Sequence, residues 1–197
     1  MASLPIRNYG DPVLRAKGEP VREFGAPLRA LGETMLETMR GAKGIGLAAP
    51  QVGLPLQLFV LDVRDPELRP VLDGRAEDPE RIMPMLLANA EVSVPEGEPV
   101  DYDEGCLSFP GVRGSVARIE RATVRYRDAE GAPHLLECSG LLARCVQHEH
   151  DHCQGVLFID RMAGPDVLLA AVNKLGAADQ EQPARGNDQS HKQHRAR

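Results

Sequence analysis

Long apolar runs are absent from this sequence of 197 residues, and the longest, such as residues 56–61, are far too short to span a bilayer. The first ten residues also lack the apolar segment of a secretory signal, because Pro5, Arg7 and Asn8 interrupt them. We therefore expect a cytoplasmic protein that does not enter a membrane.

An excess of positive charge is also absent, because 23 lysines and arginines face 29 aspartates and glutamates. A protein built mainly to bind nucleic acid needs a basic face, so this balance argues against that class. Cysteine is scarce, and in a reducing compartment the four cysteines are thiols or metal ligands rather than disulfides. The composition is otherwise that of a soluble globular protein, and the length favours one domain.

Hydrophobic periodicity predicts a mixed α+β domain. We interpret residues 65–84, and the acidic stretch before Gly105, as loops. The order of elements favours antiparallel or mixed sheets packed around a central helix, rather than a doubly wound parallel sheet. The predicted elements are helices over residues 27–40 and 140–154 and strands over residues 56–62, 85–94, 122–127 and 134–138, the last two forming a hairpin.

The strongest chemical signal is an H-E-x-x-H motif within residues 148–152. Positions i and i+4 of a helix share one face, so His148 and His152 can bind the same ion. Glu149 can then reach a water on that ion and act as a general base. The motif also occurs by chance on solvated helices. Apolar residues on both sides favour a buried helix, in which histidines and glutamates need partners.

A metal catalyst needs a third protein ligand. The metzincin pattern would place this ligand at position 158, which is phenylalanine, so the ligand should come from another segment. Cys106, which lies between Gly105 and a turn-like stretch, is the best candidate. Cys145 is either a ligand or a small buried apolar residue. We interpret Cys153 as structural.

Three segments in order resemble the motifs GxGLAAxQ, EGCLS and QHExDH of bacterial-type peptide deformylases. They are Gly44–Gln51, Glu104–Ser108 and Gln147–His152. The resemblance extends from about residue 6 to residue 162. The sequence departs from the family at Asn89-Ala90, where Asn-Pro is usual, and at Cys153, where leucine is usual.

The resemblance implies that Cys106, His148 and His152 bind one divalent metal ion with water as fourth ligand. Fe2+ is the expected native ion, and Ni2+, Co2+ or Zn2+ could replace it. The implied reaction removes the formyl group from the N-terminal N-formylmethionine of nascent proteins. The metal-bound water attacks, and Glu149 transfers the proton to the departing amine. The Gln51 side chain and the Leu107 backbone N–H would stabilise the oxyanion.

The resemblance also indicates how the substrate is held. The Gly46 backbone would pair with the peptide as an added strand, and Arg113 would contact it, although Arg113 could equally be a solvated charge. We expect Glu104 to orient the loop or its neighbours. We expect Arg144 to contribute its aliphatic stem while its charge stays in water. The methionine pocket would be walled by Leu141, Arg144 and Cys145 together with Ile45 and Tyr102.

We place the catalytic domain at residues 1–175, ending in a short helix over residues 167–175, and a disordered polar tail at residues 176–197. The tail is basic, with Arg185, Lys192, Arg195 and Arg197 against Asp188 beyond residue 183. It could contact ribosomal RNA transiently, although we favour the interpretation of a plain disordered end. We expect a monomer.

Two other functions fit the same helix. A zinc endopeptidase or other metal amidase would cleave internal bonds and ignore the formyl group. A structural zinc module, or an inactive binding protein, would have a closed four-ligand site that recruits Cys138 or Cys145. Glu149 and Gln51 favour catalysis over this third interpretation.

Overall fold

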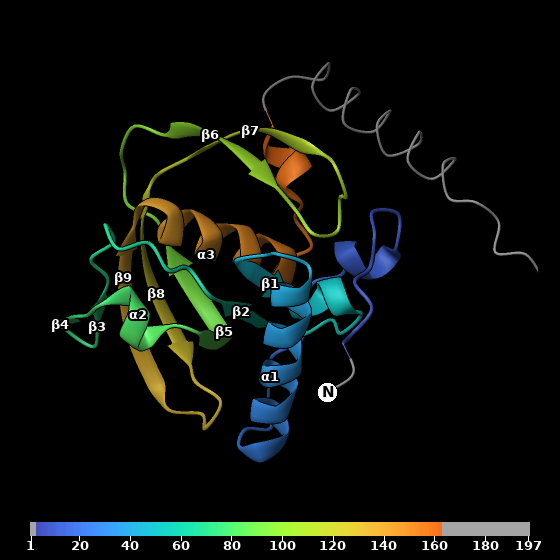
Figure 1. Cartoon of the computed structure of the whole chain (residues 1–197), viewed down its shortest axis with the longest axis horizontal. Coiled ribbons are helices and arrows are strands. Elements are labelled where there is room, and N and C mark those ends of the chain that lie inside the picture. The colour runs from blue at the N-terminus through green and yellow to red at the C-terminus, as the bar shows by residue number, and fades with distance from the viewer. Residues whose placement is uncertain (1–2, 163–197) are drawn as a thin grey trace, which may run out of the picture.

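Most of the strands form one antiparallel sheet in the computed structural model, which describes residues 3–162 (Figure 1). The predicted helix over residues 167–175 and the predicted tail over residues 176–197 lie outside the described residues. The strands of the sheet are β1 (Gly46–Ala48), β2 (Leu58–Leu61), β3 (Val71–Leu72), β4 (Arg75–Ala76), β5 (Met85–Ser93), β8 (Arg121–Arg127) and β9 (Pro133–Ser139). Their order is β1-β2-β5-β8-β9-β3-β4, so β1 is an edge strand. The predicted α+β class and the hairpin of β8 and β9 are confirmed.

Two long helices cover this sheet. Helix α1 (Ala26–Gly41) begins with a proline in its first turn, a position where the missing N–H costs nothing. It ends where the Lys43 and Gly44 N–H groups donate to the carbonyls of Arg40 and Met39, which leaves Lys43 at φ 59°. Helix α3 (Gly140–Cys153) carries the H-E-x-x-H motif. Within residues 3–162, no helix combines the length and hydrophobicity that a membrane span requires.

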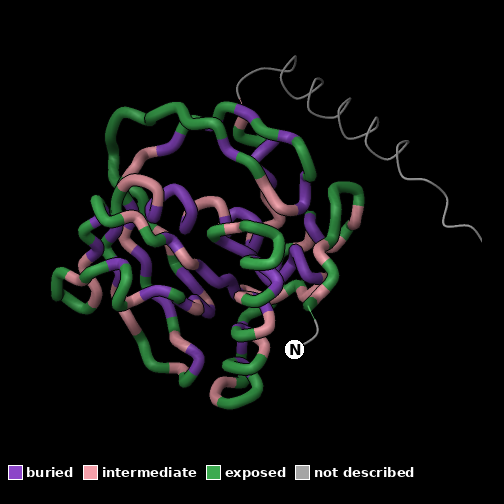
Figure 2. Tube along the Cα trace, viewed as in Figure 1, coloured by how far each residue is buried: buried purple, intermediate pink, exposed green. Residues whose placement is uncertain are grey.

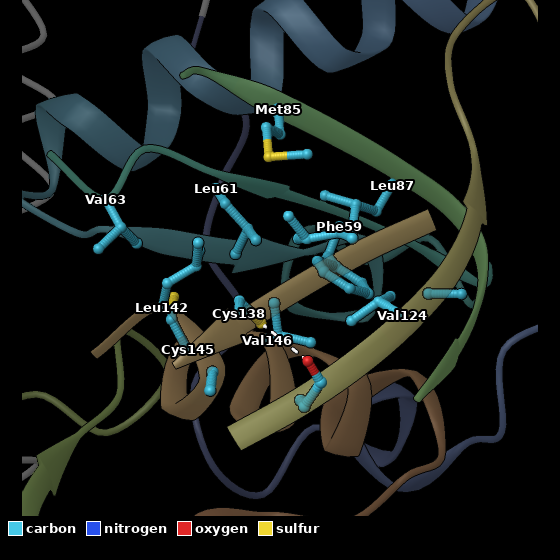
Figure 3. Close-up of a cluster of buried hydrophobic side chains, with 14 of the residues drawn as sticks. Phe59, Leu61, Val63, Met85, Leu87, Val124, Cys138, Leu142, Cys145 and Val146 are labelled. Carbon is cyan, nitrogen blue, oxygen red and sulfur yellow. Dashed lines mark hydrogen bonds between the residues drawn. The ribbon is translucent and has the colours of Figure 1, made fainter. Parts of the chain in front are cut away.

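Strand β2 shows how the two helices are separated. All four of its residues are buried, and successive side chains of a strand point to opposite faces. Phe59 and Leu61 belong to an apolar cluster shared with α3 (Figure 3), whereas Leu58 and Val60 belong to a second cluster shared with α1. Helices α1 and α3 therefore pack on opposite faces of the sheet. Each large aliphatic side chain buried there contributes roughly 1.5–3 kcal/mol.

Residues 65–84 were predicted as a surface loop, and this prediction was wrong. The segment holds β3, β4 and the short helix α2 (Pro79–Ile82). The β3–β4 turn places Asp73 at φ 50° and Gly74 at φ 79°, the left-handed backbone that a tight hairpin turn uses. Strands of two residues are too short for a period-two pattern to show in the sequence.

The stretch before Gly105 was also wrongly predicted as a loop. It contains β6 (Val100–Gly105), which pairs antiparallel with β7 (Arg113–Arg118) in a separate two-stranded sheet. Most of β6 is exposed (Figure 2), so its sequence lacks the buried residues that signal a strand. In Figure 1 this small sheet lies across α3 from the strands of the large sheet.

Candidate active site

A cavity of about 700 Å³ lies between the small sheet, helix α3 and the segment before β1. Three stretches of chain, far apart in sequence, line it. The predicted site residues that line the cavity are Ile45, Gly46, Gln51, Glu104, Cys106, Leu107, Arg113, Leu141, Arg144, Cys145, His148 and Glu149. His152 is the predicted site residue that lies outside the lining, and it is almost fully buried beneath it.

Cys106, His148 and His152 converge at the base of this cavity. Cys106 follows the last residue of β6, so the end of this strand presents its thiol to α3. The sulfur lies 3.2 Å from the His152 Nε2, and the ligand atoms of all three residues lie within 4.8 Å of one another. A thiol and two imidazoles are donors that Fe2+, Co2+, Ni2+ and Zn2+ accept. The three residues therefore fit one such ion.

The same three residues are the one group of metal-ligating side chains that residues 3–162 bring together. Neither Cys138 nor Cys145 belongs to it. Cys138 instead lies 3.6 Å from the Ala122 carbonyl, in the apolar cluster of Figure 3. A three-ligand site keeps a coordination position open, which is the arrangement of catalytic rather than structural sites.

Glu149 is buried, and few polar contacts offset the cost of burying its carboxylate. Its Oε2 has no hydrogen-bond partner among the described residues, and burial raises the pKa of Glu149 to about 7. Its other oxygen lies directly against Gly46, because a Cβ added there would collide with Oε1. A carboxyl group with a pKa near neutrality can both take and return a proton in one reaction.

Gln51 lies in a short 3-10 helix (Ala49–Val52), and its amide is held in one orientation. Its Oε1 accepts a hydrogen bond of 2.8 Å from the Ala48 N–H. The Nε2 donor consequently faces Cys106, at 3.4 Å from the sulfur, and also lies 3.3 Å from the Ser108 Oγ. The amide is therefore a fixed donor at the edge of the metal-ligand group, with Leu107 beside it in the cavity wall.

Glu104 lies behind His148 and contacts its ring. Its Oε2 is 3.0 Å from the His148 Nδ1, which leaves the Nε2 of that ring for an ion. Burial would raise the pKa of Glu104, but hydrogen bonds from His148 and Arg118 lower it to about 2. Glu104 is therefore a permanent anion that fixes the ring.

Arg118 is a residue that sequence reasoning missed. It is 3% exposed and donates both to Glu104, at 2.7 and 3.1 Å, and to Asp151 on α3, at 2.8 Å. A signal for it was present, because alternation along β7 places Arg118 on the same buried face as Gly114 and Val116. A charged residue on an otherwise apolar strand face indicates a buried ion pair.

Arg144 was expected to keep its charge in water, and this expectation was wrong. Its side chain is 3% exposed. The guanidinium donates to Glu104 at 3.0 Å and to the backbone carbonyls of Val116 and Val100 at 2.9 and 2.8 Å. These acceptors on β6 and β7 offset the cost of burying the charge. Arg144 thus ties the small sheet to α3.

Replacing Arg118 by methionine is expected to lower the free energy of unfolding by about 3–5 kcal/mol. The change leaves the buried carboxylates of Glu104 and Asp151 without a shared counterion. Urea denaturation measures the loss. Arg121→Met, at an exposed position of β8, serves as the matched control. Equal stability of the two variants would show that the buried pairs contribute nothing.

The remaining predicted residues lie nearer the mouth of the cavity. Ile45 and Tyr102 are 42% and 48% exposed, although both are large apolar side chains. Arg113 is exposed, and its Nε donates to Asp103 at 2.5 Å. Leu141 and Cys145 lie deeper, on α3. This distribution provides an apolar wall within the cavity and charged groups at its rim.

The two departures from the family pattern lie in packing positions. Asn89 has φ 53° and exchanges two hydrogen bonds with the Val21 backbone, at 2.8 and 2.9 Å. Ala90 and Cys153 are buried, and neither lines the cavity. Both departures therefore affect how the segments pack around the site rather than the site itself.

Comparisons with known proteins agree with this geometry. The family described as Polypeptide deformylase matches residues 3–167. A peptide deformylase of Opitutus terrae is 53% identical over 164 residues, which cover 81% of this chain and 85% of that protein. One of Acidothermus cellulolyticus is 47% identical over 179 residues, covering 91% and 89%.

Solved structures give the same result. A peptide deformylase of Thermus thermophilus matches with a TM-score of 0.74 and 41% identity, over 88% of this chain and 93% of that one. A Synechococcus elongatus peptide deformylase in complex with actinonin matches with a TM-score of 0.76 and 40% identity, over 88% and 86%. The chain belongs to the peptide deformylases, the metal-dependent hydrolases that remove the formyl group from the N-termini of new proteins.

Proposed function

We propose that Cys106, His148 and His152 hold one divalent ion, natively Fe2+, and that Glu149 moves the protons of formamide hydrolysis. The convergence of three ligand atoms within 4.8 Å, beside a buried carboxylate that lacks a partner, supports this assignment. An ion bound there supplies a Lewis acid that acidifies water and polarises the formyl oxygen. Ni2+, Co2+ and Zn2+ suit the same donors.

The side chains around the ion divide the remaining work. Glu149 takes a proton from the attacking water and gives it to the nitrogen as the C–N bond breaks, so that formate and a free amine leave. The Gln51 Nε2 and the Leu107 N–H donate to the oxygen on which negative charge develops. Glu104 keeps the His148 ring in the tautomer that can bind the ion.

The cavity holds the peptide next to these groups. The Gly46 backbone lies on edge strand β1, where an extended chain can pair with it. Leu141, Cys145 and Ile45 provide the apolar surface for the methionine side chain, and Arg113 meets the chain at the rim. We further propose that residues 1–175 act as a cytoplasmic monomer on nascent chains. Residues 176–197 would contact the ribosome transiently.

Formate release under anaerobic Fe2+, or with Ni2+, tests the function. The protein is expected to release formate from formyl-Met-Ala-Ser but to leave acetyl-Met-Ala-Ser, and an unformylated peptide with internal bonds, uncut. An endopeptidase would cut the last peptide. A protein that carries its metal but releases no formate would contradict the proposal.

A further inference from the structure

The charged side chains that line the cavity are mostly paired. At the rim, the Asp103 carboxylate accepts a hydrogen bond of 2.5 Å from the Arg113 Nε, and the Asp103 backbone carbonyl accepts one of 2.6 Å from the same guanidinium. Deeper in the cavity, Glu104 is bound by Arg144 at 3.0 Å and by Arg118 behind the wall. These ion pairs cancel most of the electrostatic field that the charged lining would otherwise exert on a bound peptide.

Lys43 is the exception among the lining cations. It is exposed at the rim, and it has no ion pair with another residue of the range 3–162. The other uncompensated charge of the lining, Glu149, is buried at the floor. An acidic group that enters the outer cavity therefore meets one unneutralised positive charge.

The backbone at Lys43 is a second, independent observation. Its φ of 59° lies in the left-handed region, at the position after a helix that favours glycine. The hydrogen bonds that end α1 account for this backbone conformation, which is more strained for a lysine than for a glycine. Glycine would satisfy this helix end better, so the end of α1 does not explain the lysine.

The distance of Lys43 from the reaction centre sets which part of a substrate it meets. Gly46 packs against the Glu149 carboxylate, so the formyl end of a substrate lies beside Gly46. Residues 42–46 all line the cavity and lead outward from that point. Three residues span at most about 10 Å. A chain that leaves along this segment brings its third and fourth residues to Lys43.

We propose that Lys43 makes this enzyme favour nascent chains that carry an acidic residue at the third or fourth position. The inference rests on the proposed function, because it takes the peptide to lie along residues 42–46 with its formyl group at Glu149. Attraction at the rim acts on the bound peptide before and during the reaction, so it lowers KM and leaves kcat unchanged.

The test compares C-terminally amidated peptides, because a free terminal carboxylate would itself meet Lys43. Formyl-Met-Ala-Glu-Ala amide is compared with its Gln and Lys counterparts at position three, and with the same series at position four. We expect kcat/KM for the Glu peptide to exceed that for the Gln peptide roughly 5-fold, the factor for one charge pair at 4 Å in water. The preference should shrink as salt increases.

Two variants and a control distinguish the effect of the Lys43 charge from an effect on folding. Lys43→Gly suits the left-handed backbone, so it keeps the helix end intact while the Glu/Gln ratio falls to about one. Lys43→Glu reverses the order and favours the Lys peptide. Lys17→Glu makes the same charge change outside the cavity lining and is expected to retain the preference.

Each outcome bears on a specific claim. A Lys43→Gly variant that keeps the parent's preference, or a parent that shows none, overturns the role of Lys43 while the proposed function stands. If the metal-loaded parent releases no formate even from the Gln peptide, the proposed function fails, and this inference fails with it.

Discussion

Replacing Gly46 by alanine is expected to lower kcat/KM for formyl-Met-Ala-Ser by about 100-fold or more. A Cβ at Gly46 would collide with the Glu149 Oε1 and lie 2.8 Å from both the Glu149 Cδ and the Cys145 Sγ. The backbone at Gly46 is not in the left-handed region, so alanine adds no conformational strain. The carboxylate must therefore move, and a shift of about 1 Å in a catalytic group can cost 100-fold.

Gly41→Ala is the matched control, because a Cβ at this exposed end of α1 meets no atom within 4 Å. Near-parent activity of Gly46→Ala would show that the carboxylate is not needed where the structure places it. The variant could also act by blocking the peptide backbone, and a double variant separates the two causes. If the alanine acts through Glu149, it adds little to the loss that Glu149→Gln already produces.

Glu149→Gln is expected to lower kcat by about 1,000-fold while the protein keeps its metal. The amide has the shape of the carboxyl group but cannot accept and return a proton, a function worth about 100- to 10,000-fold. Formate release measures the loss, and metal analysis of the purified protein checks the ligands. Glu98→Gln, in an exposed loop, is the matched control. A variant with a tenth of parental activity would assign the proton transfer to another group.

Stability separates this catalytic loss from a folding defect. Burial raises the pKa of Glu149 from 4.5 to about 7. A raised carboxyl pKa means that the folded state holds its proton more tightly, so this group costs stability as the pH rises from 4.5 through 7. Glutamine removes that cost. The metal-free variant is therefore expected to be at least as stable at about pH 8 as the metal-free parent.

The parts of the fold that were predicted share one property, which is that their signals are local. Helical spacing of apolar residues gave α1 and α3, and alternation gave the β8–β9 hairpin. The i, i+4 spacing likewise placed His148 and His152 on one face. Strand β6 was not predicted because most of its residues are exposed. Strands β3 and β4 were not predicted because a strand of two residues is too short to show an alternating pattern.

The unpredicted parts of the site depend on partners distant in sequence. Arg144 is buried because Glu104, forty residues earlier, accepts its hydrogen bond. Arg118 is buried between Glu104 and Asp151, which approach each other only in the folded chain. Position 46 has no room for a Cβ because the Glu149 side chain packs against it, and Glu149 lies far along the sequence. Sequence alone identifies such residues as charged or small, and their roles follow from the contacts.

Cys106 directly follows strand β6 of the two-stranded sheet, whereas His148 and His152, the other two residues of the proposed metal site, belong to α3. The ion pairs of the Arg118 and Arg144 guanidinium groups connect the two-stranded sheet to α3. We therefore expect the affinity of the proposed site for its metal ion to depend on how well the small sheet and α3 keep their relative positions. We expect a substitution that weakens these contacts, even far from the cavity, to reduce metal binding first. The seven-stranded sheet and its apolar clusters should remain intact.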